Sequence, residues 1–156
     1  RLAAYYVLHA DKVQVLPGAK DFIKRADEQG MDIAAVTNAQ KVEADVNIAR
    51  LGDQADAVQF TLSVDDFPRP KPAPDGYLMG AHRLGVDPKD VVVLEDSPVG
   101  VAAAKAAGMT VIQIQSDPAL INDNADLIVP RLDDPRVDAF VGLNPGLRAT
   151  PRKLAG

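Results

Sequence analysis

A continuous apolar run that ends in two adjacent carboxylates is the feature that most constrains the fold of this chain. Residues 91–94 read Val-Val-Val-Leu, and Glu95 and Asp96 follow directly. A run of mostly β-branched residues without polar alternation is typical of a strand buried on both faces in a parallel sheet. Ser97 is a favoured N-cap and Pro98 suits the first helical position. The sequence therefore predicts a buried strand whose carboxyl end carries both acids, which is where open α/β sheets bind ligands.

The same alternation of strand and helix signals continues along the chain. Strands are predicted over residues 33–36, 57–61, 91–94, 111–114 and 127–129, and helices over 17–30, 39–52, 77–84 and 98–108. Strands that alternate with helices are typical of a parallel sheet covered by helices. The predicted fold class is α/β, a three-layer α/β/α Rossmann-like sheet.

Composition narrows the classes of function. The chain has 156 residues, no cysteine and a formal net charge of −5. This length fits one domain with a sizeable core, and the absence of cysteine excludes disulfides and thiol catalysis and fits a cytoplasmic location. The acidic balance without a basic cluster argues against nucleic acid as a partner, and no apolar stretch is long enough for a membrane span. The sequence carries no signal for an oligomeric state.

Three loops, each directly beyond a predicted strand or in a proline-rich connection, carry the polar groups of interest. They contain Thr37-Asn38, Lys71, and the Glu95-Asp96 pair. Because the carboxyl ends of parallel strands meet at one edge of the sheet, these groups are expected to converge there. A hydroxyl, an ammonium and a pair of acids able to hold Mg²⁺ are the groups that a phosphoryl group requires. A small phosphorylated molecule is the predicted ligand.

Each of these residues also has an ordinary structural explanation. Thr37 and Asn38 fit turn chemistry or a helix cap, and Lys71 fits a solvated loop lysine. The Glu95-Asp96 pair fits a simple complement to the helix dipole. Only the order of the motifs along the chain favours a common function.

In that order, the motifs resemble those of the haloacid dehalogenase-like hydrolases, in the branch of β-phosphoglucomutase- and phosphoglycolate-phosphatase-like enzymes. The resemblance rests on Thr-Asn after a strand, on Lys-Pro-Ala-Pro-Asp-Gly-Tyr-Leu from Lys71, and on Leu-Glu-Asp-Ser-Pro-Val-Gly from residue 94, and it covers residues 16–140. It implies that Thr37, Asn38 and Lys71 bind the phosphoryl group, with Thr37 and Lys71 stabilising charge during the reaction. It further implies that Asp96 and Glu95 hold Mg²⁺ and that Ser97 supports their loop.

The family's first motif, Asp-x-Asp at the end of the first strand, has no match here. No two aspartates in this chain stand two positions apart, and Asp11 is followed by Lys and Val. The resemblance therefore predicts that the nucleophilic aspartate is not in this chain. Residues 1–16 are predicted to be the end of a helical cap with its return linker, 17–142 the core, and 143–156 a loose tail. The central first strand is expected to be missing, so that this segment alone is marginally stable, is rearranged with the two neighbouring strands paired directly, or is part of a longer chain.

The function expected from the resemblance is a magnesium-dependent phosphohydrolase that acts on a small phosphorylated metabolite through an aspartyl-phosphate intermediate. A sugar-phosphate mutase is the alternative within the same chemistry. A non-catalytic module that binds phosphate, metal or a protein is the alternative from another class. A receiver-type signalling domain also combines an aspartate, a hydroxyl and a lysine, but its acidic pair stands near the start of the chain.

Overall fold

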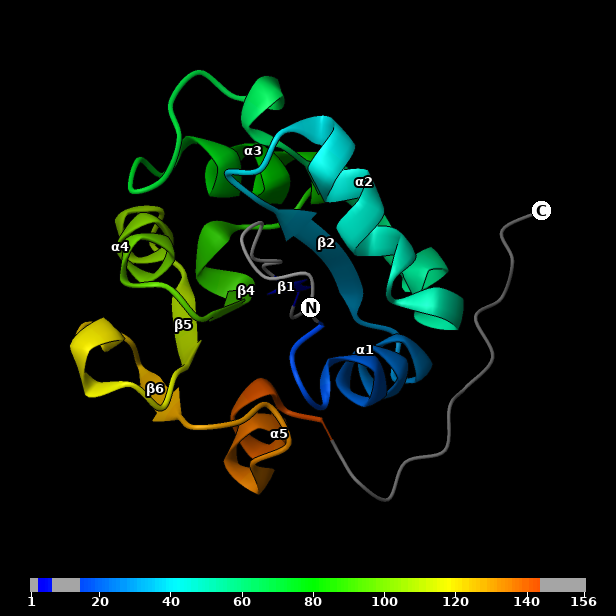
Figure 1. The fold of residues 1–156 in the computed structure, drawn as a ribbon, viewed down its shortest axis with the longest axis vertical. Coiled ribbons are helices and arrows are strands. Elements are labelled where there is room, and N and C mark those ends of the chain that lie inside the picture. Colours follow the sequence, from blue (N-terminus) through cyan, green and yellow to red (C-terminus); the bar gives the residue numbers. More distant parts are fainter. Residues whose placement is uncertain (1–2, 7–14, 144–156) are drawn as a thin grey trace.

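The structure is a computed structural model that describes the backbone of residues 3–6 and the complete residues 15–143. Six parallel strands form one sheet in the order β3-β2-β1-β4-β5-β6 (Figure 1). The strands are β1 (Ala3–Tyr6), β2 (Asp32–Val36), β3 (Val58–Leu62), β4 (Val91–Glu95), β5 (Thr110–Ile114) and β6 (Leu127–Val129). The predicted α/β class with a parallel sheet is confirmed.

Helices connect these strands. The α-helices are α1 (Ala19–Glu28), α2 (Lys41–Ala49), α3 (Asp75–Leu84), α4 (Pro98–Ala106) and α5 (Pro135–Val141). Short 3-10 helices are η1 (Gly52–Ala57), η2 (Val64–Asp66), η3 (Pro88–Asp90) and η4 (Pro118–Leu120). Helix α4 begins as predicted, because the Ser97 side chain accepts a hydrogen bond from the Gly100 N–H and Pro98 occupies the first turn.

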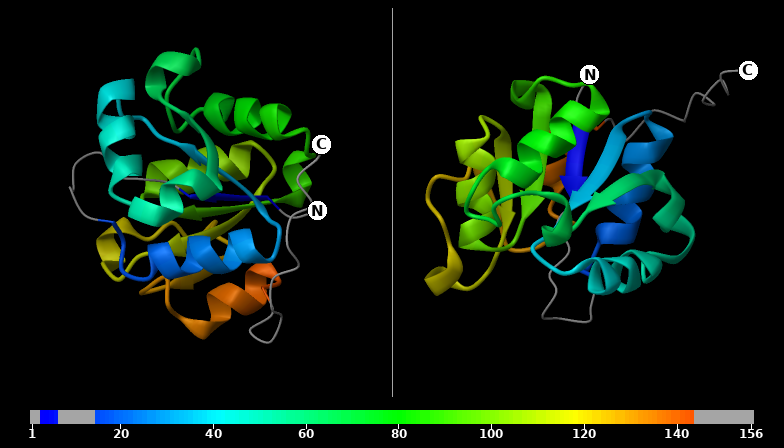
Figure 2. Two further views of the ribbon diagram at one scale, coloured as in Figure 1. Left: turned by 90° about the vertical axis from the view of Figure 1, so that its right-hand side faces the viewer. Right: turned by 90° about the horizontal axis from the view of Figure 1, so that it is seen from above.

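Two apolar clusters cover the two faces of the sheet. One joins α1 and α5 to one face, with Phe22 and Ile23 of α1 against Leu94 and Ile112. The other joins α3 and α4 to the opposite face, where Tyr77 is buried. Figure 2 shows the sheet between these helix layers. The core strands β2 and β4 are buried along their whole length, as expected for strands covered on both faces.

The centre of the sheet differs from the prediction. Residues Ala3–Tyr6, predicted as part of a cap helix, form strand β1, which lies between β2 and β4 and pairs with both. The expectation of a missing central strand, with β2 and β4 paired directly, is therefore wrong. The physical reason is that β2 and β4 present rows of backbone N–H and C=O groups, and any short apolar segment in reach satisfies them by pairing. A four-residue apolar run does not distinguish strand from helix by its pattern.

The predicted domain boundaries fall partly outside the described residues. Strand β1 places residues 3–6 in the sheet of the core, whereas residues 1–2 and 7–14 of the predicted cap end and linker are not described. The predicted loose tail lies almost wholly in residues 144–156, which are not described either. Within the described ranges, none of the helices has the length and apolar character required to cross a bilayer.

Candidate active site

The candidate site lies at the carboxyl ends of strands β2 and β4. Thr37 follows β2 directly, Glu95 is the last residue of β4, and Asp96 comes next. Lys71 comes from the loop between η2 and α3, and its side chain reaches the end of the sheet because its ammonium contacts Val36 and Glu95. The three predicted loops therefore meet at one edge of the sheet.

Lys71 is buried, with 5% of its side chain exposed. Its Nζ atom donates to the carbonyl oxygen of Val36 at 3.0 Å, to the hydroxyl of Tyr77 at 3.0 Å and to Oε1 of Glu95 at 2.8 Å. These contacts account for the three N–H donors of an ammonium. A lysine that is almost completely removed from water requires such partners, since an uncompensated buried charge is very costly.

Glu95 is the counter-ion of Lys71 and is completely buried. Besides Lys71, the Tyr77 hydroxyl donates to Oε1 at 2.7 Å, and Oε2 accepts from the backbone N–H of Asp96 and from the N–H and hydroxyl of Ser97 at 3.1–3.2 Å. Burial alone would raise the pKa of Glu95, but the Lys71 charge and these hydrogen bonds lower the pKa below its ordinary value. Glu95 is therefore held as a carboxylate.

Thr37 and Asn38 are placed differently. Thr37 is buried, its N–H donates to the Leu62 carbonyl at 2.9 Å, and its hydroxyl accepts from the Ala39 N–H at 3.0 Å. Asn38 is exposed, and its side-chain amide brackets the Lys71 backbone: Oδ1 accepts from the Lys71 N–H at 2.9 Å, and Nδ2 donates to the Lys71 carbonyl at 3.3 Å. Asn38 thus joins the loop after β2 to the lysine loop.

The backbone of Asp96 is fixed on both sides. Its N–H donates to Glu95, while its carbonyl accepts from Gln115 Nε2 at 3.0 Å and lies 3.4 Å from Gln113 Nε2. Ser97, predicted to support this loop, contacts Glu95 and caps helix α4 at the same time. The peptide that carries the Asp96 side chain is therefore held by strand β5 as well as by its own loop.

The described residues do not by themselves form a magnesium site. Among them there is no group of three or more His, Cys, Asp or Glu side chains placed to hold a metal. A carboxylate offers about four lone-pair positions, and Glu95 already accepts five hydrogen bonds. Of the two predicted ligands, Glu95 therefore has no lone pair left for a metal.

Two residues of the site were not predicted, Tyr77 and Gly100. Tyr77 is the first residue of the helix predicted over 77–84, and the sequence pattern assigns its hydroxyl no role. Gly100 carried a usable signal, since glycine within a helix costs about 1 kcal/mol relative to alanine and usually has a packing reason. A Cβ atom at Gly100 would lie 1.7 Å from Oε1 of Glu95, so the glycine provides the space for that carboxylate.

Comparison with known proteins identifies relatives of this chain. Residues 1–108 match the family described as haloacid dehalogenase-like hydrolase. Hexitol phosphatase A of Escherichia coli K12 is 33% identical over 134 residues, which cover 86% of this chain and 57% of that protein. (DL)-glycerol-3-phosphatase 2 of Arabidopsis thaliana is 35% identical over 129 residues, which cover 78% of this chain and 53% of that protein.

A solved structure shows the same fold. The crystal structure of CbbY from Rhodobacter sphaeroides in complex with phosphate superimposes with a TM-score of 0.69 and 26% identity, covering 74% of this chain and 53% of CbbY. The chain thus spans little more than half the length of these three relatives.

Proposed function

Because this chain belongs to the haloacid dehalogenase-like hydrolases, we propose that it carries the phosphate-binding part of a phosphatase site for small phosphorylated metabolites. The observation that supports this proposal is the buried Lys71 ammonium at the carboxyl end of the sheet, next to the loop of Thr37. A positive charge fixed at that edge, together with a hydroxyl and backbone N–H groups, is suited to the oxygens of a phosphoryl group. The phosphatases named above, which act on hexitol phosphates and glycerol 3-phosphate, support the class of substrate.

The position of the nucleophile refines the proposal. Tyr6, the last residue of β1, pairs with Ala35 of β2 and Leu94 of β4. Thr37 comes two residues after Ala35, and Asp96 comes two residues after Leu94. In the sequence, the residue two positions after Tyr6 is Leu8. We therefore propose that the aspartate that attacks phosphorus is not among the residues of this chain.

The proposed reaction needs that carboxylate in addition to the residues described above. An aspartate oxygen would bond to phosphorus while the bond to the substrate oxygen breaks, and the released alkoxide would take up a proton. Water would then cleave the acyl phosphate and give inorganic phosphate and the free carboxylate. The Lys71 charge would neutralise the phosphoryl group and the Thr37 hydroxyl would hold one of its oxygens in both steps, and Asp96 is the proposed ligand of a magnesium ion.

Calorimetric titration with inorganic phosphate tests the binding half of this proposal. We expect the chain to bind phosphate, and Lys71→Met to weaken binding by about tenfold or more, since the positive charge beside the phosphate is lost. Lys24→Met, on the exposed surface of α1, is the matched control and should leave the affinity unchanged. If Lys71→Met does not fold, Asn38→Ala removes the bracket on the Lys71 loop and should also weaken binding. An unchanged affinity in these site variants overturns the proposal.

Hydrolysis of p-nitrophenyl phosphate tests the chemical half. We expect no turnover by this chain with or without Mg²⁺, and magnesium-dependent turnover by a longer in-frame form that carries an Asp-x-Asp motif. With a sugar phosphate as the substrate instead, release of inorganic phosphate rather than an isomerised sugar phosphate separates a phosphatase from a mutase. Turnover by the chain itself would show that an aspartate within it, with Asp11 the first to substitute, acts as the nucleophile.

A second candidate function follows from the sequence, which has no Asp-x-Asp motif. A module that binds a phosphoryl group without turning it over needs no such motif. Phosphate binding without hydrolysis, in every form of the protein that the gene encodes, would favour this module over the phosphatase.

A further inference from the structure

The polar centre of the site contains one residue to which the proposed reaction gives no role, Tyr77. Tyr77 lies on α3 and is completely buried. Its hydroxyl accepts a hydrogen bond from Lys71 Nζ at 3.0 Å and donates one to Glu95 Oε1 at 2.7 Å. Because Lys71 also donates to that Glu95 oxygen at 2.8 Å, the three groups form a closed triangle of hydrogen bonds.

We propose that Tyr77 is a positioning residue that holds the Lys71 ammonium at the phosphate site. This inference rests on the proposed function for its consequence, but not for its geometry. A lysine side chain has four rotatable bonds, and its ion pair with Glu95 fixes only one direction of the ammonium. The Tyr77 hydroxyl adds a second fixed partner from another helix, and the Val36 carbonyl adds a third from the end of β2.

The apolar part of Tyr77 is what makes its hydroxyl a fixed point. The ring lies in the cluster that joins α3 and α4 to the sheet, and Lys71 Nζ is 4.7 Å from the ring centroid. A ring packed on all sides has no freedom to move its hydroxyl, so the position of α3 determines the position of the ammonium. Such support by packed neighbours is what a site that must hold its groups within about 0.5 Å requires.

Glu95 completes the arrangement from the opposite side. Its Oε2 atom is held by the Asp96 and Ser97 N–H groups and by the Ser97 hydroxyl, and its carboxylate occupies the space over Gly100. The acceptor that Lys71 and Tyr77 share therefore cannot follow the lysine if one contact is lost. Without the Tyr77 hydroxyl, one Lys71 donor loses its partner and only the contacts to Glu95 and Val36 still hold the ammonium.

The direct test is the NMR signal of the Lys71 side-chain ammonium, which is assigned by its disappearance in Lys71→Arg. In the unaltered protein we expect slow exchange of its protons with water and a nuclear Overhauser contact with the Tyr77 ring. In Tyr77→Phe, which keeps the ring, we expect the exchange to accelerate at least fivefold. Met109→Val, a change in the same apolar cluster at the other end of the sheet, is the control for a purely structural effect and should leave this signal unchanged.

The consequence for function is tested by phosphate titration of the same variants. Tyr77→Phe should weaken inorganic phosphate binding about tenfold, and Met109→Val should not. Unchanged exchange and unchanged affinity in Tyr77→Phe overturn the inference. If Tyr77→Phe does not fold, absence of the contact between Lys71 and the Tyr77 ring in the unaltered protein overturns it. If the unaltered protein binds no phosphate, the proposed function fails, and the exchange rate alone then decides whether Tyr77 positions Lys71.

Discussion

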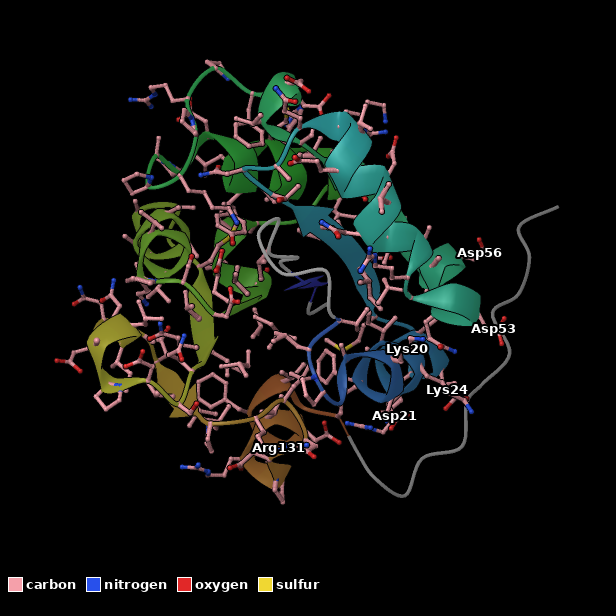
Figure 3. All side chains as sticks on the ribbon, in the orientation of Figure 1. Lys20, Asp21, Lys24, Asp53, Asp56 and Arg131 are labelled. Atoms are coloured by element: carbon pink, nitrogen blue, oxygen red, sulfur yellow. The ribbon has the colours of Figure 1, made fainter. Side chains whose placement is uncertain are left out.

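Two charged regions of this molecule contain the same residue types but differ in what surrounds them. At the carboxyl end of the sheet, Lys71 and Glu95 are buried and in contact. At the outer edge of α1 and η1, Lys24, Asp53 and Asp56 line a hollow and are exposed to solvent (Figure 3). The second region carries more charge, yet its side chains are screened by water.

Burial with complete hydrogen bonding, rather than the number of charges, distinguishes the candidate site from the exposed charged region. Charges that remain in water lose little hydration free energy on folding and contribute little to stability. The Lys71–Glu95 pair has lost its water, and its desolvation is offset only because the ammonium and the carboxylate have partners on all sides. A chain retains such an arrangement where the position of a charge matters, and here that position is at the ends of β2 and β4.

The largest expected effect comes from breaking the buried pair. Lys71→Met leaves the Glu95 carboxylate buried without its cation, which should lower the free energy of unfolding by about 3–5 kcal/mol. Lys24→Met, the matching change in the exposed region, should stay within about 0.5 kcal/mol. Urea unfolding of both variants measures the contrast. Equal losses in the two variants would mean that the buried pair has no special role in stability.

The next effect concerns the space in which Glu95 lies. Gly100→Ala would place a methyl group against the Glu95 carboxylate, whereas Gly76→Ala would place one 2.8 Å from Val36 and 2.9 Å from Phe67. Each should cost about 1–3 kcal/mol of stability through overpacking. Only Gly100→Ala should also accelerate exchange of the Lys71 ammonium, because it alone displaces a member of the triangle. An undisturbed Lys71 signal in Gly100→Ala would show that the Glu95 carboxylate can take another position and still hold the Lys71 ammonium.

The order of elements and the convergence of three loops were predictable from the sequence, and the roles of individual groups were less so. Buried strands such as residues 91–94 and caps such as Ser97 are local signals, and parallel topology then brings the loop ends together. Helix α5 was not predicted, although it carries the same local signals. Asp134 is its N-cap, Pro135 opens it and Gly142 ends it in the left-handed conformation.

Partners across the sheet left no local signal. The pairing of Lys71 with Glu95, the Tyr77 hydroxyl in their midst, and the Asn38 bracket on the lysine loop join residues far apart in sequence. Strand β1 was missed for a related reason, because its structure is imposed by the free edges of β2 and β4 rather than by its own four residues. Tertiary context thus decided both the centre of the sheet and the centre of the site.

A smaller effect is expected for the half-buried ion pair between α1 and α5. Arg25 makes two hydrogen bonds to the Asp138 carboxylate, at 2.8 and 2.9 Å, with 35% and 23% of the two side chains exposed. The exposure of this ion pair lies between those of the two charged regions compared above. Arg25→Met should lower the free energy of unfolding by about 1 kcal/mol at low salt. Urea unfolding at 0.05 and 0.5 M NaCl measures this loss, which should shrink at the higher salt. A loss as large as that of Lys71→Met would contradict the ranking by burial.

The smallest effect at neutral pH is expected for the pair of Arg136 and Asp134, in which the arginine side chain is 59% exposed and the aspartate side chain 18%. Hydrogen bonds from the Arg136 side chain and N–H lower the pKa of Asp134 to about 2. Since this folded-state pKa is below the unfolded value of about 3.9, the pair's contribution is present above that value and is lost as pH falls toward 2. In Arg136→Gln the NMR titration of Asp134 should move back toward its ordinary value, while the urea midpoint at pH 7 stays nearly unchanged. Because salt screens exposed charges, 0.5 M NaCl should shift the unaltered protein's Asp134 titration in the same direction. A low Asp134 pKa that resists salt would show that the exposed Arg136 guanidinium does not set it, and the ranking of these pairs by the exposure of their cations would then fail here.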